Sequence, residues 1–396
     1  MTETMRIPGR RFLHSPGPTH VPDEVRDAIG RQPMDLADPR LDRLIADCEV
    51  GLKALVGSPG AEIFMAASNG HGAWEMAIQN LAAPGQTVLV PGTGHFSESW
   101  AVQAEAMGLN VRRTPWREGH AIDIGAVEQA LREDRAHQIV AVFAVHTDTA
   151  SGITSDLAAL RDALRASGHP ALFVADVVAS LAAAPFDMDA LGVDAAIGAS
   201  QKGLMLPPGL AFVAAGPRAV QAALRNPTPR FYFDWVRRRS EISYRKFCGT
   251  PPMNLLMGLQ AALKLIDAEG LEAVVRRHRQ LAGAVHAAVT AWSAAGALDF
   301  FAREPAERSV SVTAVQVRQG IDPEALRRVA RERFQVAIAG GLGPLAGRVF
   351  RIGHLGDLNP AMVLGCLGGV EAALRVQGVE IGGDGLARAA AALAAA

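Results

Sequence analysis

The chain has 396 residues, of which 49% are hydrophobic and 20% are charged. One hydrophobic core usually stops growing below this length, so we expect two domains, and the composition excludes a largely disordered chain. Lysine and arginine number 39 against 40 aspartates and glutamates, which leaves a net charge of -1. No general excess of positive charge exists to attract nucleic acid or an anionic membrane, so we expect a small-molecule substrate.

The cysteine pattern and the apolar runs favour a cytoplasmic protein. Cys48, Cys248 and Cys366 are few and far apart, which fits neither a disulfide framework nor a zinc knuckle. The N-terminal residues MTETMRIPGRR are polar and lack the apolar segment of a signal peptide. The densest apolar run, residues 139–145, is far shorter than the roughly 20 residues that span a bilayer.

Between about residues 60 and 215, short apolar runs alternate with segments of helical periodicity. The apolar runs predict strands at 61–67, 87–91, 139–145, 171–175, 195–199 and 209–215. They show no polar alternation, which is typical of strands buried on both faces of a parallel sheet. The segments between them predict amphipathic helices at 71–82, 97–108, 123–134 and 156–167. This alternation predicts an α/β domain with a mostly parallel sheet and helices on both faces.

The remainder of the chain predicts a second, smaller domain of α+β type. Residues 226–252 are rich in Pro, Arg and aromatic residues, and the segment is too long for an ordinary connection. A helical region follows from Asn254 to about Ala294, and short β-like runs then mix with helices up to an Ala-rich end that we expect to fray. We expect the divisions to be an N-terminal segment over 1–20, a large domain over 21–275 and a small C-terminal domain over 276–396.

Three motifs stand at the ends of predicted strands, where ligands of open α/β sheets bind. The run ALFVAD ends in Asp176, AAIGASQKG ends in Lys202 and Gly203, and SNGHGAWE (68–75) opens a helix. A lysine amine can condense with an aldehyde cofactor, and burial lowers its pKa so that the neutral form is available. An aspartate can hold a pyridine nitrogen protonated, and a helix N-terminus suits a phosphate dianion. Each motif alone is weak, so their order and spacing together carry the hypothesis.

The chain resembles the class V aminotransferases, specifically the branch that contains the alanine–, serine– and aspartate–glyoxylate aminotransferases. The matching motifs cover nearly its whole length: PGPTHVP (16–22), SNGHGAWE (68–75), HTDTASG (146–152), VADVVAS (174–180), GASQKGLMLPPGLA (198–211), TPP (250–252) and GGLGPLAGRVFRIGHLG (340–356). The resemblance implies a fold type I transferase that uses pyridoxal 5′-phosphate, with a large domain and a smaller C-terminal domain. It also implies a homodimer with shared active sites.

The resemblance also assigns residues to the cofactor. It implies that Lys202 carries the cofactor and moves a proton between the substrate and the cofactor, and that Asp176 pairs with the pyridinium nitrogen. The residues implied to surround the phosphate are Asn69, Gly70, His71, Gln201 and, from the neighbouring subunit, Thr250. Phe96 stands where the family places an aromatic residue stacked on the ring, and Thr149 stands near the ring oxygen.

The resemblance gives the substrate carboxylate to Arg351, helped by the backbone of Pro16, Gly17 and Pro18. A planar guanidinium matches a carboxylate through two parallel hydrogen bonds, so Arg351 is also a sensible choice on chemical grounds.

Some positions depart from the pattern of the family. Phe96 replaces the tryptophan of eukaryotic relatives, Phe247 replaces a tyrosine found in some relatives, and His20 stands where Asn is common. MDLADPRL (34–41) lacks the His-Arg pair typical of the bacterial serine branch. HTDTASG and the DP of this segment resemble the pyridoxamine–pyruvate aminotransferases, so the substrate stays open.

Other signals are set aside. The glycines of GGLGPLAG lead from a weak strand into another strand, which argues against a dinucleotide-binding loop. The histidines lack metal-ligand spacing, so no metal site is expected. His146 and His354 either line the substrate pocket or are structural, and the second reading is favoured. The arginines at 237–239 predict a solvated loop, and Trp74 and Trp100 predict core positions.

The leading hypothesis is an enzyme that moves an amino group from serine, aspartate or alanine to glyoxylate or pyruvate. One alternative is an aminotransferase of the pyridoxamine–pyruvate type. A second is a lyase or desulfurase on the same fold, which would need a mobile cysteine in the small domain, where only Cys366 lies, within a predicted helix. A non-catalytic binding protein is the third, and intact Lys202, Asp176 and Arg351 argue against it.

Overall fold

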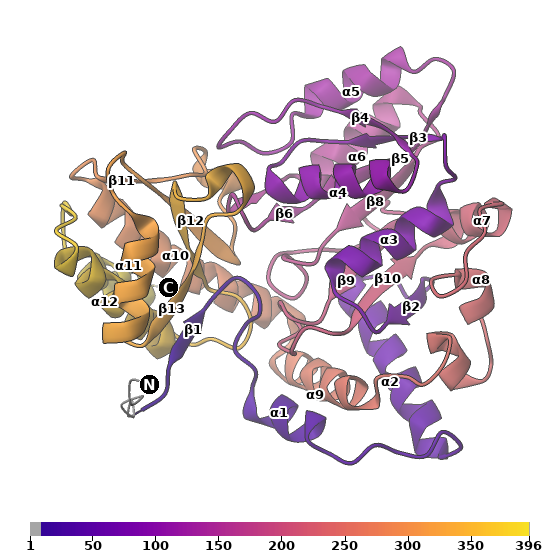
Figure 1. The fold of residues 1–396 in the computed structure, drawn as a ribbon, viewed down its shortest axis with the longest axis horizontal. Coiled ribbons are helices and arrows are strands. Elements are labelled where there is room, and N and C mark those ends of the chain that lie inside the picture. Colours follow the sequence, from indigo (N-terminus) through magenta and orange to yellow (C-terminus); the bar gives the residue numbers. More distant parts are fainter. Residues whose placement is uncertain (1–8, 396) are drawn as a thin grey trace, which may run out of the picture.

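The structure is a computed structural model that describes residues 9–395. The expectation of a polar N-terminus falls largely on residues 1–8, which lie outside this range. The described chain forms two lobes, each built around its own sheet, and the chain passes between them near its N-terminus and again after α9 (Figure 1).

The large lobe is built on a 7-stranded sheet of order β2-β10-β9-β8-β5-β3-β4. Its strands are β2 (Glu62–Ala66), β3 (Thr87–Val90), β4 (Asn110–Arg113), β5 (Ile139–Val145), β8 (Leu172–Asp176), β9 (Ala195–Ala199) and β10 (Ala211–Ala215). The strands pair in parallel except at β10, which runs antiparallel to both β2 and β9. The strands predicted from the apolar runs are confirmed, and β4 is an additional edge strand.

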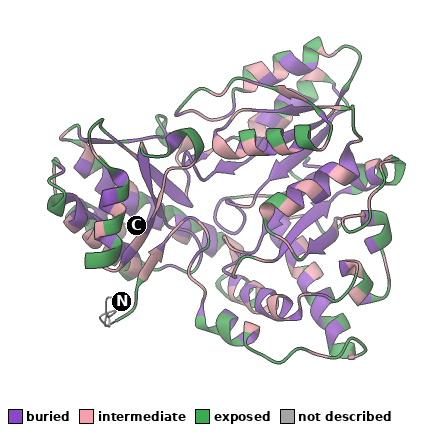
Figure 2. Ribbon diagram, viewed as in Figure 1, coloured by how far each residue is buried: buried purple, intermediate pink, exposed green. Residues whose placement is uncertain are grey.

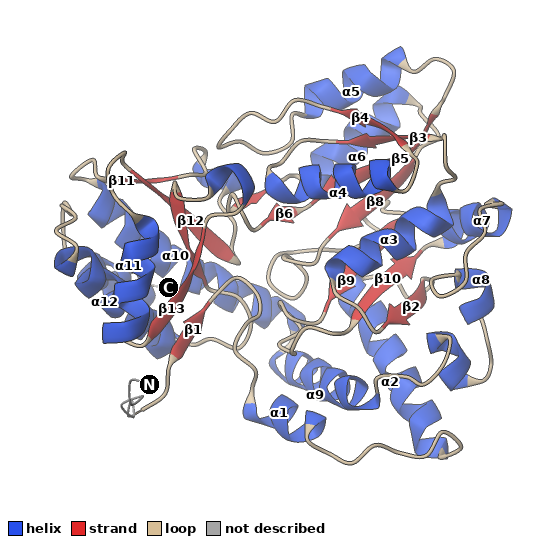
Figure 3. Ribbon diagram, in the orientation of Figure 1, coloured by secondary structure: helices blue, strands red, loops and turns tan. Residues whose placement is uncertain are grey.

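Helices cover both faces of this sheet, as the alternation of strands and helices predicts (Figure 3). On one face lie α3 (Gly70–Leu81), α4 (His95–Ala106) and α7 (Pro217–Arg225). On the other lie α1 (Asp23–Ile29), α2 (Pro39–Val56), α5 (Ile124–Glu133), α6 (Leu157–Ser167) and α9 (Met253–Glu269). Neighbouring residues of β5 pack on opposite faces of the sheet. Phe143 stacks on Trp100 of α4, while Val142 packs in the hydrophobic core on the other face. The central strands β5, β8, β9 and β10 are accordingly buried almost along their whole length (Figure 2).

The small lobe contains a 5-stranded sheet of order β1-β13-β14-β12-β11. Its strands are β1 (Phe12–His14), β11 (Leu298–Phe300), β12 (Val312–Val317), β13 (Val336–Gly340) and β14 (Val349–Gly353), and its helices are α10 (Leu271–Ser293), α11 (Pro323–Arg333), α12 (Pro360–Val376) and α13 (Gly385–Ala394). Strand β1 pairs in parallel with β13, so the N-terminal segment contributes an edge to the C-terminal sheet. The domain boundaries at 20 and 275 stay predictions.

One local expectation about the C-terminal end is wrong. The Ala-rich end does not fray, because α13 packs against α10 with Ala389 fully buried, and Glu371 accepts hydrogen bonds from the first backbone N–H groups of α13. The long segment 226–252 contains α8 (Trp235–Arg238) and a 3₁₀ turn at Ser243–Phe247.

The arginine run 237–239 is not a uniformly solvated loop. Arg238 is buried, and its guanidinium donates to the carbonyls of Met65 and Lys246, the latter at 2.9 Å. The bond to Met65 fastens the segment to strand β2, and the bond to Lys246 holds the segment together. Among the described helices, none is both long enough and apolar enough to cross a membrane.

Candidate active site

Lys202 lies in the turn that follows strand β9, beside the N-terminal segment. Its Nζ donates a hydrogen bond to the carbonyl of Pro16, and Thr19 Oγ1 donates to the Lys202 carbonyl at 3.0 Å. Burial lowers the pKa of the amine to about 8, and the nearby positive charge of Arg351 acts in the same direction. A substantial fraction of this amine is therefore neutral at physiological pH.

Asp176 ends strand β8, which runs parallel to β9 with Asp176 opposite Ile197. Its Oδ1 accepts from the backbone N–H of Val178 at 2.8 Å, and its Oδ2 accepts from the indole Nε1 of Trp74 at 3.1 Å. Burial raises the pKa of this carboxyl to about 6, while these two donors and the charge of Lys202 act against the increase. Asp176 is therefore mostly ionised at pH 7, and its charge reaches Lys202.

The turn before helix α3 contains Asn69, Gly70 and His71. The Asn69 side chain caps the helix, since its Oδ1 accepts from the N–H groups of His71 and Gly72 at 3.1 and 3.3 Å. Burial lowers the pKa of His71. Next to Lys202, the Oε1 of Gln201 is buried without a hydrogen-bond partner in the described part of the chain.

Arg351 brings the small lobe into the site. It lies on β14 and is buried, with Nε donating to the carbonyl of Gly340 and Nη1 to the carbonyl of Thr149, each at 2.7 Å. Burial lowers its pKa to about 10, so the guanidinium stays charged at neutral pH. The bond to Thr149 joins β14 of the small lobe to the large lobe.

Phe96 and Gly17 lie close to these groups. Phe96, in the first turn of α4, meets the ring of Trp74 edge-on, with ring centroids 6.4 Å apart. Gly17 lies against the Lys202 side chain, and a Cβ placed at this glycine would be 2.6 Å from Nζ. Position 17 therefore has to be glycine for the amine to keep its place.

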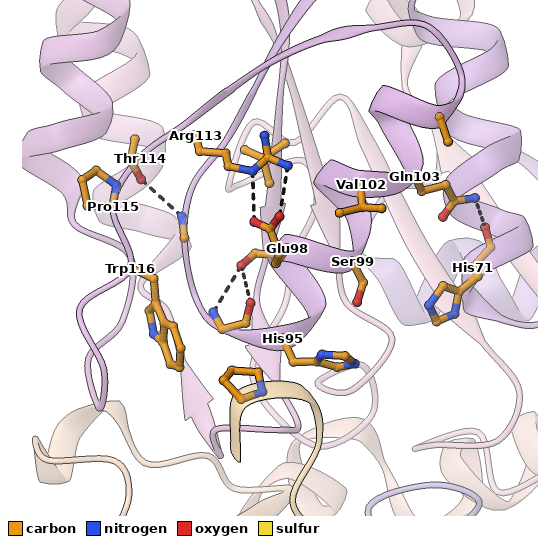
Figure 4. Close-up of a pocket in the computed structure, with 16 residues that line it drawn as sticks. His71, His95, Glu98, Ser99, Val102, Gln103, Arg113, Thr114, Pro115 and Trp116 are labelled. Carbon is orange, nitrogen blue, oxygen red and sulfur yellow. Dashed lines mark hydrogen bonds and ion pairs between the residues drawn. The ribbon is translucent and has the colours of Figure 1, made fainter. Parts of the chain in front are cut away.

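A groove of about 1020 Å³ adjoins the site along the outer side of α4 (Figure 4). It is lined by His71, His95 and Gln103, among other residues, and Gln103 donates to the carbonyl of His71 at 3.0 Å. Glu98 pairs with Arg113 on its wall. Lys202, Asp176 and Arg351 do not line this groove.

Some predicted residues lie apart from this cluster. Thr250 is exposed near the end of the ordered 226–252 segment. His354 is structural, because its ring nitrogens bond to Thr313 Oγ1 and to the Val310 carbonyl, both at 2.9 Å. His146 is buried near Phe186, with ring centroids 6.3 Å apart, and its Nδ1 has no partner among residues 9–395. Within the same range, no group of His, Cys, Asp and Glu side chains is arranged to hold a metal ion.

Two side chains of this cluster are not predicted from the sequence. Trp74 does pack in the core, as expected, but it also donates to Asp176. Asp148 is fully buried and accepts from the backbone N–H of Phe96 at 2.8 Å. A polar atom on a core residue next to the SNGHG turn would have pointed to Trp74, and an acidic residue inside the buried HTDTASG motif would have pointed to Asp148.

Known proteins resemble the chain along most of its length. The sequence model of the family described as Aminotransferase class-V matches residues 11–346. The chain is 40% identical over 377 residues to the L-aspartate–glyoxylate aminotransferase of Paracoccus denitrificans, with 94% of each chain covered. It is 39% identical over 392 residues to the serine–glyoxylate aminotransferase of Methylorubrum extorquens, which covers 97% of this chain and 96% of that protein.

Solved structures resemble its fold as well. The ureidoglycine–glyoxylate aminotransferase of Bacillus subtilis aligns with a TM-score of 0.89 at 27% identity, over 98% of this chain and 99% of the other. The pyridoxamine–pyruvate aminotransferase of Mesorhizobium loti aligns with a TM-score of 0.88 at 27% identity, over 99% and 100%. The chain belongs to the class V aminotransferases, and this family and its fold type I architecture imply dependence on pyridoxal phosphate.

Proposed function

We propose that this enzyme transfers an amino group from a small L-amino acid to glyoxylate or pyruvate, in two half-reactions that share one pyridoxal phosphate. The observation that carries this proposal is the buried amine of Lys202, with a pKa lowered to about 8, set among the charges of Asp176 and Arg351. One group can hold the cofactor, one can act on its ring and one can bind a carboxylate.

The residues present fit pyridoxal phosphate. Asp176 accepts one bond at each oxygen, which leaves capacity for a further donor such as a ring N–H. The amide of Gln201 has a buried oxygen without a partner in the described chain, and rotation of the amide would present its NH₂ group to a phosphate. We assign the other phosphate contacts to Asn69, Gly70 and His71 at the N-terminus of α3, where helix N–H groups favour an anion. Phe96 is assigned to the ring face and Thr149 to the ring oxygen.

Each catalytic residue then has a definite task. Bound pyridoxal phosphate supplies an electron sink for the charge that develops at the substrate Cα. Ionised Asp176 keeps the ring nitrogen protonated, because the ion pair favours the charged form. Lys202 would hold the cofactor through Nζ and, once its amine is free, would carry the proton from the substrate Cα to the cofactor. Arg351 binds the α-carboxylate, aided by the backbone at Gly17, and so orients the Cα–H bond.

The choice of substrates follows the relatives. The similar proteins named for aspartate–glyoxylate and serine–glyoxylate transfer support serine or aspartate as donor and glyoxylate as acceptor. The pyridoxamine–pyruvate aminotransferase supports a second candidate with pyruvate as acceptor. A lyase that uses a cysteine nucleophile is disfavoured, because Cys366 is fully buried within α12 and burial raises the pKa of its thiol.

A panel of donors against glyoxylate, pyruvate and 2-oxoglutarate tests the activity. We expect keto-acid product without release of ammonia, together with a cofactor absorbance band that shifts when the amino acid is added. Ammonia release would favour the lyase, and a protein that binds no pyridoxal phosphate would overturn the proposal. Pyridoxamine as the preferred donor would favour the second candidate.

We also propose a homodimer with shared active sites, in which Thr250 reaches the phosphate of the partner subunit. Thr250 is exposed in the single chain, which leaves it available for such a contact. Thr250→Ala should weaken cofactor retention and promote dissociation at low concentration, while Lys202 still captures the cofactor. A fully active monomer in sedimentation at assay concentration would contradict this assembly.

The free thiols of Cys48, Cys248 and Cys366 support our proposal of a cytoplasmic location.

A further inference from the structure

Asp148 is a second buried carboxylate at the site, and the chemistry assigned above does not use it. It belongs to β6 (Thr147–Asp148), which forms a hairpin with β7 (Ile153–Thr154). The side chain is fully buried, and burial raises its pKa. Its charge acts on Lys202, on Asp176 and on Arg351, so it lies among all three groups. A buried carboxylate is costly unless its oxygens are hydrogen-bonded, and the donors that satisfy it indicate its task.

The carboxylate fastens the start of helix α4. Oδ2 accepts from the backbone N–H of Phe96 at 2.8 Å and from Thr93 Oγ1 at 3.4 Å, and Oδ1 accepts from Ala150 N–H at 2.9 Å. A Cβ at Gly94, whose φ is +138°, would lie 3.1 Å from Oδ2, so glycine permits this approach. A negative charge at a helix N-terminus is also favourable. The anchored residue is Phe96, which we assign to the cofactor ring.

The residue after Asp148 fastens the other side of the site. The carbonyl of Thr149 accepts the 2.7 Å bond from Arg351 Nη1. The turn is held in shape because Gly152 N–H donates to the Asp148 carbonyl at 2.9 Å. The Asp148 side chain also holds this turn, because Oδ1 accepts from Ala150 N–H, which belongs to the same peptide group as the Thr149 carbonyl. A displacement of the Asp148 side chain would therefore disturb both Phe96, on α4 of the large lobe, and Arg351, on β14 of the small lobe.

We propose that Asp148 is a positioning residue that jointly sets the place of Phe96 against the cofactor and of Arg351 against the substrate carboxylate. Asp148 touches neither ligand itself in this proposal. The inference rests on the proposed function, since it concerns cofactor affinity and substrate KM. The expected effect of removing Asp148 differs from that of removing an ordinary helix cap. Loss of a cap lowers the stability of the protein without changing both the cofactor dissociation constant and the KM for the substrate.

The test compares Asp148→Asn with Asp123→Asn in the same full-length enzyme. Asp123 also caps a helix, α5, by accepting from Ala126 N–H at 3.0 Å, but it does so on an exposed surface remote from Lys202. In Asp148→Asn one oxygen becomes an NH₂ group, so one of the backbone donors loses its acceptor. The measurements are the dissociation constant of pyridoxal phosphate by absorbance titration, KM and kcat for the amino donor, and the thermal midpoint.

We expect Asp148→Asn to raise both the cofactor dissociation constant and the KM by roughly tenfold. Asp123→Asn should leave both constants unchanged, with at most a small change in the thermal midpoint, because Asn caps a helix nearly as well as Asp. Phe96→Leu should mainly weaken the cofactor, and Arg351→Lys should mainly raise KM, so the joint change would be particular to Asp148. If Asp148→Asn changes only the thermal midpoint, or only one of the two constants, the inference is wrong.

If Asp148→Asn fails to fold, the same two constants are measured in Thr93→Val instead. It removes only the weaker donor to Oδ2, so a smaller increase in the same two constants is expected, and unchanged constants would overturn the inference. A wild-type protein that binds no pyridoxal phosphate would instead contradict the proposed function.

Discussion

The indole Nε1 of Trp74 donates a 3.1 Å hydrogen bond to Oδ2 of Asp176, so a core residue of α3 holds the carboxylate that we assign to the cofactor ring. Trp74→Phe removes this donor with little change of shape. A buried hydrogen bond to a charged group contributes about 1.5–3 kcal/mol, so kcat/KM should fall roughly ten- to a hundredfold. Steady-state kinetics measure this change.

Trp100→Phe is the matched control. Trp100 stacks on Trp74 with centroids 5.3 Å apart, but its own buried Nε1 has no partner within residues 9–395. We expect this variant to keep its activity. Equal losses in both variants would mean that packing, and not the bond to Asp176, accounts for the effect.

Asp176→Asn should retain the fold and bind the cofactor but react orders of magnitude more slowly. Asn keeps the size of the side chain and loses the charge that holds the ring nitrogen protonated, an electrostatic contribution commonly worth several kcal/mol. Single-turnover absorbance measurements would follow the amino-acid half-reaction. Asp194→Asn serves as the control, since Asp194 is also buried but accepts from Phe173 N–H and pairs with Arg218. A rate for Asp176→Asn within about tenfold of wild type would remove Asp176 from its assigned role.

The sequence predicted the large sheet well because its central strands are continuous apolar runs. It missed β4, whose NVRR residues form a partly exposed edge strand that needs no apolar run. It also did not predict that Phe12–His14 would pair with Val336–Ile338, because this contact joins segments at opposite ends of the chain. Local periodicity carries no information on such a pairing.

In the candidate site, too, some residues were predicted from the sequence and others were not. Lys202, Asp176 and Arg351 were found from motifs, and the structure brings their charges together. The partners that hold them were not found, because the carbonyls of Pro16, Thr149 and Gly340 are backbone atoms that every residue type offers. The burial of Arg238 against β2 also escaped prediction, since its acceptor is the backbone carbonyl of Met65, far away in the sequence.

Arg351→Lys should raise the KM for the amino donor roughly 10- to 100-fold with a smaller effect on kcat. A lysine cannot bond simultaneously to the carbonyls of Gly340 and Thr149 and present a planar fork to a carboxylate, and each charge-assisted bond contributes about 1.5–3 kcal/mol. Arg327→Lys, on the neighbouring helix α11, is the control and should leave KM unchanged. A donor amide that lacks the carboxylate should react poorly with wild type and no worse with Arg351→Lys. A further loss with the amide would show that Arg351 acts elsewhere.

Buried neutral histidines should make the protein sensitive to acid. Burial lowers the pKa of His14, His278 and His286 from the ordinary value of 6.5 to about 4. As the pH falls below 6.5, the unfolded chain takes up protons before the folded chain does. The stability present above pH 6.5 is therefore lost progressively down to about 4, by an amount on the order of a few kcal/mol for each histidine. Denaturant unfolding across this pH range measures the loss.

His286→Leu isolates one of these groups. The Nε2 of His286 is buried and has no partner in the described chain, so leucine removes a titrating group without breaking a bond at that atom. The variant should lose less stability between pH 6.5 and 4 than wild type does. An identical pH dependence in both proteins would rule out His286 as a contributor.

The most direct test of the account is chemical trapping of the cofactor on its lysine. Reduction of the holoenzyme with borohydride, digestion and mass spectrometry would locate the pyridoxyl group. The other lysines are Lys53, Lys246 and Lys264, of which Lys246 is held by Glu49 at 2.7 Å. We predict that the pyridoxyl group is attached to Lys202, and that Lys202→Ala shows neither labelling nor turnover. Labelling of another lysine in the active wild-type enzyme, or retained turnover in Lys202→Ala, would contradict it.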